Sequence, residues 1–307
     1  MTNQGDDRDS LVIQPGDRLL VIANPATRRD VHKIIGALRR AAPDGVTIDT
    51  HITQRAGQAR ALAEQHGDGA RLLVAIGGDG TVGDVAAAAV DHDIPLAIMP
   101  GGSTNIIAQE LGIPTGPGAG AALIFGRHRL VRMDAGACGD RVFLHMVGAG
   151  FDSRFFARSN QALKRKVGWL AYIPAATRTL FDQPVEARVT VDGDEVRAIT
   201  TMVLVANGRS IIHSSLRIAD GISKSDGVFD VFIVTARSGP DKARLLGHLI
   251  KRDIDASPHV IRLRGQEVRI ETDPSLPVQF DGDVHGETPV HLRMLPEAVR
   301  VLAPPRG

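Results

Sequence analysis

Apolar and polar positions alternate in two ways between residues 19 and 111 of the chain. Short runs that are apolar or alternate with a period of two predict strands at Leu19–Ala23, Val46–Ile52, Leu72–Ile76 and Pro95–Met99. Apolar residues spaced three and four apart predict helices at Val31–Ala41, Gln58–His66, 82–91 and Ile106–Leu111. We expect Thr81 to be the N-cap of the third helix, and Gly112 and Pro114 to end the fourth. This order of strands and helices predicts a parallel, doubly wound sheet.

A different pattern follows beyond residue 130. Turn residues separate many short strand-like segments, at Leu130–Asp134, Val142–Val147, Val185–Asp192, Arg197–Ala206, Val228–Val234, Val260–Arg264, Glu267–Thr272, Val278–Asp281, Val290–Met294 and Val299–Leu302. Two stretches of helical periodicity, 154–181 and 239–252, interrupt the series. Such a series is typical of an antiparallel sheet or sandwich. The expected fold class is therefore α/β, with a doubly wound parallel-sheet N-terminal domain and a larger, mainly antiparallel β-sandwich C-terminal domain.

The change of pattern places a domain boundary within residues 131–137. We expect a mobile tail at 1–17, an α/β domain at 18–134 and a β-rich domain at 135–307. The last strand, close to the C-terminus, is expected to pack back near the first domain.

Composition narrows the class of protein. The chain has 307 residues, of which 43% are hydrophobic and 23% charged, and its net charge of +1 gives no large basic field for nucleic acid. Cys138 is the single cysteine, which excludes an internal disulfide and a multi-cysteine metal site and fits a reducing compartment. No apolar stretch reaches the ~18–20 residues that span a bilayer, and the polar start is unlike a secretion signal. We expect a cytoplasmic protein whose membrane contact, if any, is peripheral, at the inner surface.

Glycine-rich or polar turns follow three of the predicted strands. Residues 77–81 read GGDGT, residues 100–105 read PGGSTN and residues 24–27 read NPAT. Turns after parallel strands open at the carboxyl edge of the sheet, where doubly wound folds bind ligands. Glycines there allow close approach of the backbone, and the start of the next helix presents N–H groups to phosphate. Asp79 would repel a bare phosphate, which indicates a metal or a sugar hydroxyl nearby.

Further motifs lie in the β-rich part of the chain. They are FLHMVGAGFD at 143–152, ANG at 206–208, SDGVFD at 225–230 and FDGD at 280–283. In this order and spacing, together with GGDGT and GGSTN, they resemble the diacylglycerol kinase catalytic-domain family, which includes bacterial diacylglycerol kinases and the sphingosine and ceramide kinases. The resemblance covers residues 17–304. GGDGT alone is shared with NAD kinases and phosphofructokinase-like enzymes, so the combination carries the evidence.

The resemblance implies that the first domain binds ATP and that its γ-phosphoryl group passes to a lipid hydroxyl, with Mg²⁺ and backbone donors neutralising the phosphates. The lipid acceptor would lie at a membrane surface and be received by the second domain. Diacylglycerol, giving phosphatidic acid in phospholipid biosynthesis, is the first choice; sphingoid bases, ceramide, phosphatidylglycerol and monoacylglycerol stay open. By the same resemblance, ATP contacts Asn24, Pro25, Ala26, Thr27, Arg28, Thr53, Gly77, Gly78, Asp79, Gly80, Thr81, Val82, Gly83 and Ser103.

Asp281 and Asp283 are the candidate proton acceptors. A lipid hydroxyl loses its proton as it attacks phosphorus, and a carboxylate within hydrogen-bond reach can accept it. Asp281 matches the aspartate of the family, and Asp283 stands where the family usually has glutamate. Either could accept the proton, and an ordinary Asp-Gly hairpin turn is the alternative to a catalytic role.

Acidic residues indicate two places for Mg²⁺. Asp79 and Asp134 are carboxylates on the nucleotide side, which suits the ion that accompanies ATP. A structural Mg²⁺ of some relatives corresponds to a second place, formed by Ser223, Asp226 and Val228. An Asx-type turn before a strand explains that second segment equally well.

Two alternatives to a lipid kinase stay open: a kinase for a soluble acceptor, such as an NAD kinase, and a non-catalytic nucleotide-binding regulator. The regulator is favoured by Ile106 and Gln109, where the family frequently has aspartate and arginine, so the metal network through these positions should be absent or rearranged. Residues 154–181 combine basic and aromatic side chains, which fits either an anionic membrane surface or a helix with a solvated basic face. A homodimer is also open.

Overall fold

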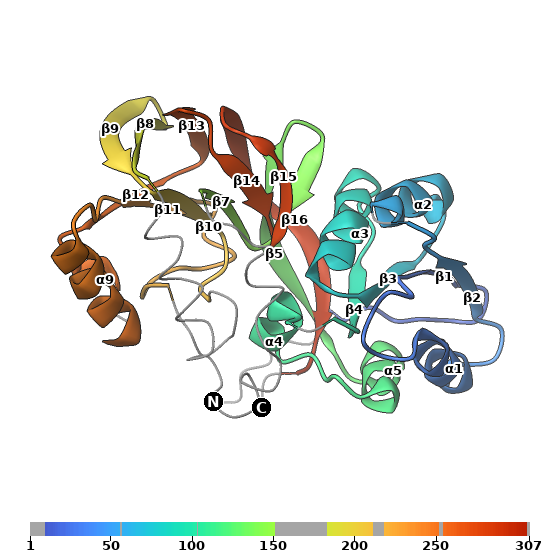
Figure 1. Cartoon of the computed structure of the whole chain (residues 1–307). Coiled ribbons are helices and arrows are strands. Elements are labelled where there is room, and N and C mark those ends of the chain that lie inside the picture. Colours follow the sequence, from blue (N-terminus) through green and yellow to red (C-terminus); the bar gives the residue numbers. More distant parts are fainter. Residues whose placement is uncertain are drawn as a thin grey trace, which may run out of the picture. The chain divides into compact units, whose positions relative to one another are not determined.

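The computed structural model of the protein describes residues 10–55, 57–102, 104–150, 183–210, 218–251 and 254–305. The chain divides into two compact units. The first unit comprises the residues up to Met133 together with those from Glu297 onward, and the second unit comprises Asp134–Pro296. Each unit is organised around β-structure (Figure 1).

The first unit contains a parallel sheet. Its strands lie in the order β2 (Thr47–Ile52), β1 (Arg18–Ala23), β3 (Leu72–Gly77) and β4 (Leu96–Pro100). The C-terminal part of β16 (Val290–Ala303) lies parallel beside β4, with Val301 opposite Leu96. All residues of β3 and β4 are buried, as expected for central strands of a sheet that is covered on both faces.

Helices cover both faces of this sheet. On one face α1 (Val31–Ala41) packs against α5 (Pro117–Phe125), and on the other α2 (Gln58–Gly67) packs against α3 (Asp79–Asp91), as Figure 1 shows. A shorter helix, α4 (Ile106–Leu111), follows β4. The doubly wound parallel arrangement that the sequence predicts is therefore confirmed.

The start of α3 differs from the prediction. The helix begins at Asp79 with Gly78 as its N-cap, and the Val82 N–H already donates to the Gly78 carbonyl at 3.0 Å. The prediction of Thr81 as the N-cap is therefore wrong, because the chain turns into the helix as soon as the extended Gly78 is passed. Thr81 lies inside the first turn and is buried.

Two further parts of the first unit do not follow from the sequence pattern. The residues of α5 read PGAGAALIF, without the polar face that marks an amphipathic helix. Residues 10–17 belong to the predicted tail, yet Leu11 is buried in the core of this unit and its N–H donates to His128 Nε2 at 3.1 Å.

The described strands of the second unit are antiparallel. A six-stranded sheet has the order β12 (Val260–Gly265), β11 (Phe229–Val234), β10 (Met202–Ala206), β7 (Met146–Ala149), β14 (Pro277–Phe280) and β15 (Asp283–Glu287). Elsewhere in the unit, β13 pairs with β16 and with β8, and β8 pairs with β9; their bounds are β13 (Glu267–Asp273), β8 (Val185–Val191) and β9 (Asp194–Thr200).

Apolar residues of both sets of strands form one buried core. The rings of Phe143 and Phe229 stack in it with their centroids 5.6 Å apart. Phe143 ends β6 (Arg141–Phe143), which pairs with β5 (Arg129–Cys138). Between β11 and β12 the chain forms α9 (Gly239–Lys251) and the 3₁₀ turn η2 (Ile254–Ala256). The mainly antiparallel character of the predicted second domain is confirmed.

Several predicted segments have other limits in the structure. Val142–Val147 splits into β6 and β7, Arg197–Ala206 splits into β9 and β10, and the two predicted C-terminal strands form the single strand β16. The sequence does not predict β15, whose residues DVHGE lack apolar alternation. The predicted insert at 154–181 lies outside the described residues.

Candidate active site

Backbone hydrogen bonds join the three turns of the first unit. The N–H of Asn24, after β1, donates to the Ile76 carbonyl of β3 at 2.9 Å. The N–H of Gly101, after β4, donates to the Gly77 carbonyl at 2.8 Å, and Arg28 N–H donates to the Gly101 carbonyl at 3.2 Å. The turns after β1, β3 and β4 therefore form one connected group at the carboxyl edge of the sheet.

Glycine is required where two of these turns meet. A Cβ on Gly102 would lie 2.6 Å from the Gly78 Cα and 3.0 Å from Asn105 Oδ1. A Cβ on Gly77 would lie 2.5 Å from the Thr81 side chain. Real Cβ atoms do not approach backbone this closely, so only glycine allows the second turn to rest on GGDGT.

The start of α3 is suited to an anion. Because the Val82 N–H makes the first bond of the helix, to Gly78, the N–H groups of residues 79–81 precede the helical ladder. Gly78, Asp79 and Gly80 are half-buried, and the positive end of the helix dipole adds to the attraction for an anion. A side-chain bond from Asn24 Nδ2 to Thr81 Oγ1, at 3.2 Å, ties the first turn to this helix.

The other residues predicted to contact ATP occupy varied environments. Pro25, Ala26 and Arg28 are exposed, and Thr27 is half-buried. Thr53 follows β2, is buried and donates its N–H to the Ala23 carbonyl at 2.8 Å. Val82 and Gly83 are buried inside α3, and Ser103 lies outside the described residues.

Asp79 is directed toward the start of α4. Its Oδ1 accepts the Ile107 N–H at 3.4 Å, which is a long hydrogen bond. Ile106, where the resemblance implies an aspartate, is buried, and Gln109 donates through Nε2 to the Thr104 carbonyl. These two departures from the family pattern thus serve packing and the local backbone in this protein.

The Asp281 carboxylate binds three successive backbone N–H groups of the second unit. Oδ2 accepts from Leu144 at 2.8 Å, and Oδ1 accepts from His145 at 2.8 Å and from Met146 at 2.9 Å. In return the Asp281 N–H donates to the Met146 carbonyl at 2.9 Å. These bonds occupy the backbone between β6 and β7, which explains why the predicted strand Val142–Val147 is interrupted there.

Asp281 and Asp283 stand in different surroundings. Burial raises the pKa of the Asp281 carboxyl, while the His145 charge and the three backbone donors act in the opposite direction. Asp281 has φ 48°, and the following turn is fixed by the Gly282 N–H, which donates to Gln279 Oε1 at 2.6 Å. Asp283 begins β15 and is exposed. The turn thus presents one enclosed and one solvated carboxylate.

Asn207 and His145 are buried polar residues that the sequence does not single out as site residues. Asn207 Nδ2 donates to the Asp134 carbonyl at 2.9 Å and to the Leu144 carbonyl at 2.8 Å. His145 Nε2 lies 2.6 Å from the Ser210 carbonyl. Asn207 contacts the segment whose N–H groups bind Asp281, and His145 belongs to that segment. In the sequence, Asn207 follows an apolar run and His145 interrupts one.

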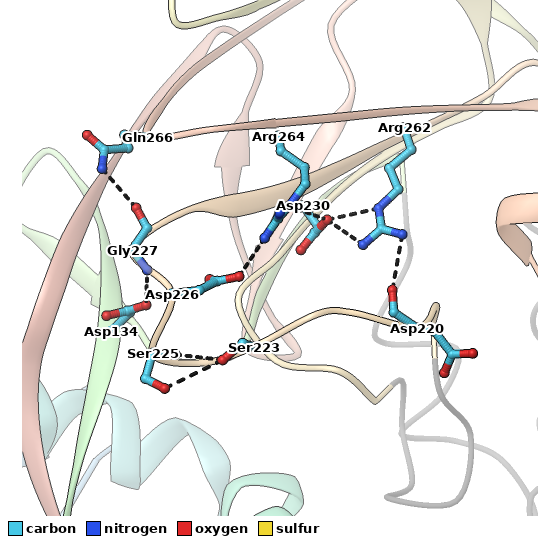
Figure 2. A network of polar contacts seen from close by, with 10 residues as sticks. All are labelled: Asp134, Asp220, Ser223, Ser225, Asp226, Gly227, Asp230, Arg262, Arg264 and Gln266. Atoms are coloured by element: carbon cyan, nitrogen blue, oxygen red, sulfur yellow. Dashed lines mark hydrogen bonds and ion pairs between the residues drawn. The ribbon is translucent and has the colours of Figure 1, made fainter.

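Asp134 lies against the loop of residues 223–228. Its N–H donates to the Lys224 carbonyl at 2.7 Å, and its Oδ2 accepts the Gly227 N–H at 2.7 Å. The Gly227 carbonyl in turn accepts from Gln266 Nε2 at 3.1 Å. Figure 2 shows Asp134 and Gln266 on either side of Gly227. The sequence predicts Asp134 as a metal ligand, and the structure gives its carboxylate a role in positioning this loop.

Asp226, the charged member of the second predicted metal place, faces a cation of the protein itself. Its Oδ2 lies 2.5 Å from Arg264 Nη2 (Figure 2). Ser223 Oγ accepts the Ser225 N–H at 3.3 Å, and Val228 is half-buried. Across the described ranges, no group of three or more histidine, cysteine, aspartate or glutamate side chains is arranged to bind a metal. As the side chains stand, this second place does not fit a divalent cation.

Two family models match the chain. The diacylglycerol kinase catalytic domain matches residues 18–138, and the YegS C-terminal NAD kinase beta sandwich-like domain matches residues 145–303. The chain belongs to the diacylglycerol kinase catalytic-domain family. The sequence resemblance is thereby confirmed, and the two models together span both units.

Relatives and solved structures agree with this family. An uncharacterized protein of Synechocystis sp. is 30% identical over 82% of this chain, which spans 59% of that protein's length. A candidate lipid kinase of Staphylococcus aureus is 27% identical over 75% of this chain and 76% of its own. Two structures of candidate diacylglycerol kinases from Bacillus anthracis align with TM-scores of 0.77 and 0.74, at 22% and 24% identity. They cover 96% and 93% of this chain, and 97% and 96% of their own, and they show the shared fold.

Proposed function

We propose that this kinase-family protein transfers the γ-phosphoryl group of ATP to a lipid hydroxyl, with diacylglycerol as the first acceptor to test and phosphatidic acid as the product. The observation that carries the proposal is the connected group of turns after β1, β3 and β4. It combines glycine at the closest backbone contacts with the N-terminus of α3. Such a group binds the phosphates of a nucleotide through backbone donors.

Within this group, we assign the N–H groups of residues 79–81 and the glycines Gly77, Gly78 and Gly80 to the phosphates. Asn24 and Thr27 position the first turn, since Asn24 bonds to Thr81 and Gly101 packs on Thr27. Val82 and Gly83, which are buried inside α3, stay in the proposed set of contacts. Asn24–Arg28, Thr53 and Ser103 complete the proposed nucleotide site.

Mg²⁺ supplies charge neutralisation to the phosphates when it binds together with ATP. The half-buried carboxylate of Asp79, in the first turn of α3, fits such an ion because oxygen is the ligand that Mg²⁺ prefers. Asp134 fits less well, because it is fully buried and its Oδ2 accepts the Gly227 N–H. We therefore retain Asp79 as the metal candidate.

We assign the removal of the hydroxyl proton to Asp281. Three N–H groups fix its carboxylate, and a carboxylate with about four lone-pair sites has one left for an incoming hydroxyl. Burial raises its pKa, which makes the group a better base than a solvated carboxylate. Exposed Asp283 has no comparable enclosure and is assigned an auxiliary role at the surface of the turn.

The test is an assay with γ-labelled ATP and mixed micelles that contain one acceptor at a time. Diacylglycerol, monoacylglycerol, phosphatidylglycerol, ceramide and a sphingoid base are compared with NAD, the soluble acceptor. We expect label in a lipid product that requires both ATP and Mg²⁺. Label in NAD and in none of the lipids would replace the proposal with a soluble-acceptor kinase. ATP binding without any labelled product across the panel would favour a nucleotide-binding regulator.

Within the part of the chain that the structure describes, the helices are too short or too polar to cross a bilayer. We propose that the enzyme meets its acceptor peripherally, which can be tested by co-sedimentation with vesicles that contain anionic lipid.

A further inference from the structure

The loop of residues 223–228 is held by contacts with other parts of the second unit. Asp134 binds it twice, through the Lys224 carbonyl and the Gly227 N–H. Gln266 binds the Gly227 carbonyl from the chain that follows β12. Figure 2 shows the contacts of Gly227 in the loop backbone.

Among the described residues, the charged contact of Asp226 is with Arg264. The guanidinium reaches Asp226 Oδ2 through Nη2 at 2.5 Å and Asp230 Oδ1 through Nε at 3.2 Å. It therefore bridges a carboxylate of the loop and a carboxylate of β11. The side chain of Asp226 is 29% exposed and that of Asp230 only 1%, so Arg264 neutralises charge where water screens it least.

The register of the sheet fixes this arrangement. Asp230 lies opposite Arg264 in the antiparallel pair of β11 and β12, and Arg262, two residues before Arg264, also binds Asp230 at 2.7 Å. Side chains at positions i and i+2 of a strand share a face, so both guanidinium groups converge on the Asp230 carboxylate. Arg264 thus contacts Asp226 and Asp230 through two different nitrogens of the same guanidinium group.

We infer that the Arg264 guanidinium takes the place of a divalent cation beside the loop, so that residues 223–228 keep their conformation without bound metal. A cation at Asp226 would meet the positive charge of Arg264 and would find only neutral carbonyl oxygens, those of Ser223 and Val228, as the other proposed ligands. Divalent ions in oxygen sites usually have several ligands, carboxylates among them. The inference concerns the fold of this loop and does not depend on which acceptor is phosphorylated.

The test uses the whole protein without nucleotide, so that ions brought by ATP do not contribute. Thermal unfolding is measured in excess EDTA, in MgCl₂ and in CaCl₂, and calorimetry with each salt measures binding directly. We expect the wild-type midpoint to be the same in all three solutions, and any weak binding of Mg²⁺ or Ca²⁺ to be unchanged in Asp226→Asn. A lower midpoint in EDTA, or a bound ion that Asp226→Asn abolishes, would overturn the inference.

A second arm removes the guanidinium. Arg264→Gln should lower the midpoint of thermal unfolding in EDTA. Because Asp226 then lacks its cationic partner, the variant should bind Ca²⁺ about tenfold more tightly than the wild type, and CaCl₂ should restore part of the lost midpoint temperature. The double variant Arg264→Gln/Asp226→Asn should lose this recovery. Arg269→Gln is the matched control, because Arg269 forms an exposed ion pair with Glu271 elsewhere in the unit. An Arg264→Gln variant that is as stable as the wild type in EDTA would contradict the role given to Arg264. If that variant does not fold, the wild-type and Asp226→Asn measurements still decide the question.

Discussion

Replacing Asp281 with asparagine tests the geometry of the proposed proton acceptor. The amide oxygen can keep the bonds from His145 and Met146, both of which go to Oδ1. The amide nitrogen then faces the Leu144 N–H, which is 2.8 Å from Oδ2 in the native protein, so a donor meets a donor. Asparagine tolerates the left-handed backbone at φ 48°, so the change adds no strain there.

The expected loss of stability follows from these contacts. A hydrogen bond to a charged group contributes about 1.5–3 kcal/mol and one to a neutral group about 0.5–1.5 kcal/mol, and an unsatisfied donor costs about 1–3 kcal/mol. Removing the half-buried charge offsets part of the sum, because partial burial disfavours the ionised carboxyl. We expect a net loss of about 2–3 kcal/mol. For a unit of this size, that corresponds to a midpoint lower by about 4–12 °C.

Two measurements check this reasoning, with Asp283→Asn as the matched control in the same turn. Thermal unfolding should show the loss for Asp281→Asn, and a change within about 0.5 kcal/mol for the exposed Asp283. Below the unfolding range, Asp281→Asn should bind ATP normally by calorimetry but form no labelled lipid. Unchanged stability of Asp281→Asn would refute the three-donor geometry, and near-normal turnover would remove Asp281 from the chemistry.

Three further predictions follow from other contacts. Gly102→Ala places a Cβ 2.6 Å from the Gly78 Cα and should weaken ATP binding, measured by calorimetry, about tenfold or more. The control Gly118→Ala has open space around its Cβ and should bind ATP as the wild type does. Equal affinities of the two variants would show that the two turns need not touch. In the Asp283→Asn variant, Asp281 is the remaining carboxylate of the turn, and burial raises its pKa. The kcat of this variant should fall as the pH decreases through a value above the ordinary aspartate range, because the base becomes protonated. A kcat that stays constant down to the ordinary range would contradict the assignment. Arg262→Gln removes two of the hydrogen bonds to buried Asp230, at 2.9 and 2.7 Å. The free energy of unfolding, measured by chemical denaturation, should fall by about 3 kcal/mol, and almost not at all for Arg269→Gln. Similar losses in the two variants would argue against the buried network.

Local pattern was sufficient to predict the elements that depend on local burial. β3 and β4 are continuous apolar runs, and a fully buried parallel strand requires such a run. GGDGT could be placed at a strand-to-helix turn for the same reason, because glycines end the run. The start of α3 was mispredicted because Gly78, with no side chain to cap the helix, nevertheless adopts the extended backbone of an N-cap.

Contacts between distant residues explain what the sequence pattern could not supply. The break between β6 and β7 depends on Asp281, which lies 137 residues from Leu144 in the chain. The pairing of Asp226 with Arg264, 38 residues apart, depends on the register of β11 and β12. Neither is encoded in the neighbouring residues, so motif reading located the acidic side chains but not the groups that neutralise them.

The path of β16 has a consequence for biosynthesis. Residues 290–296 of this strand belong to the second unit and residues 297–303 to the first, where Val301 pairs with Leu96. The first unit is therefore made early on the ribosome, but its sheet lacks the strand beside β4 until more than 160 intervening residues have been synthesised. An open strand edge of this kind invites pairing with other chains. Nascent chains that stall before residue 297 should therefore depend on chaperones. A protein of residues 10–133 alone should aggregate, and covalently linking residues 297–305 to it should restore its solubility.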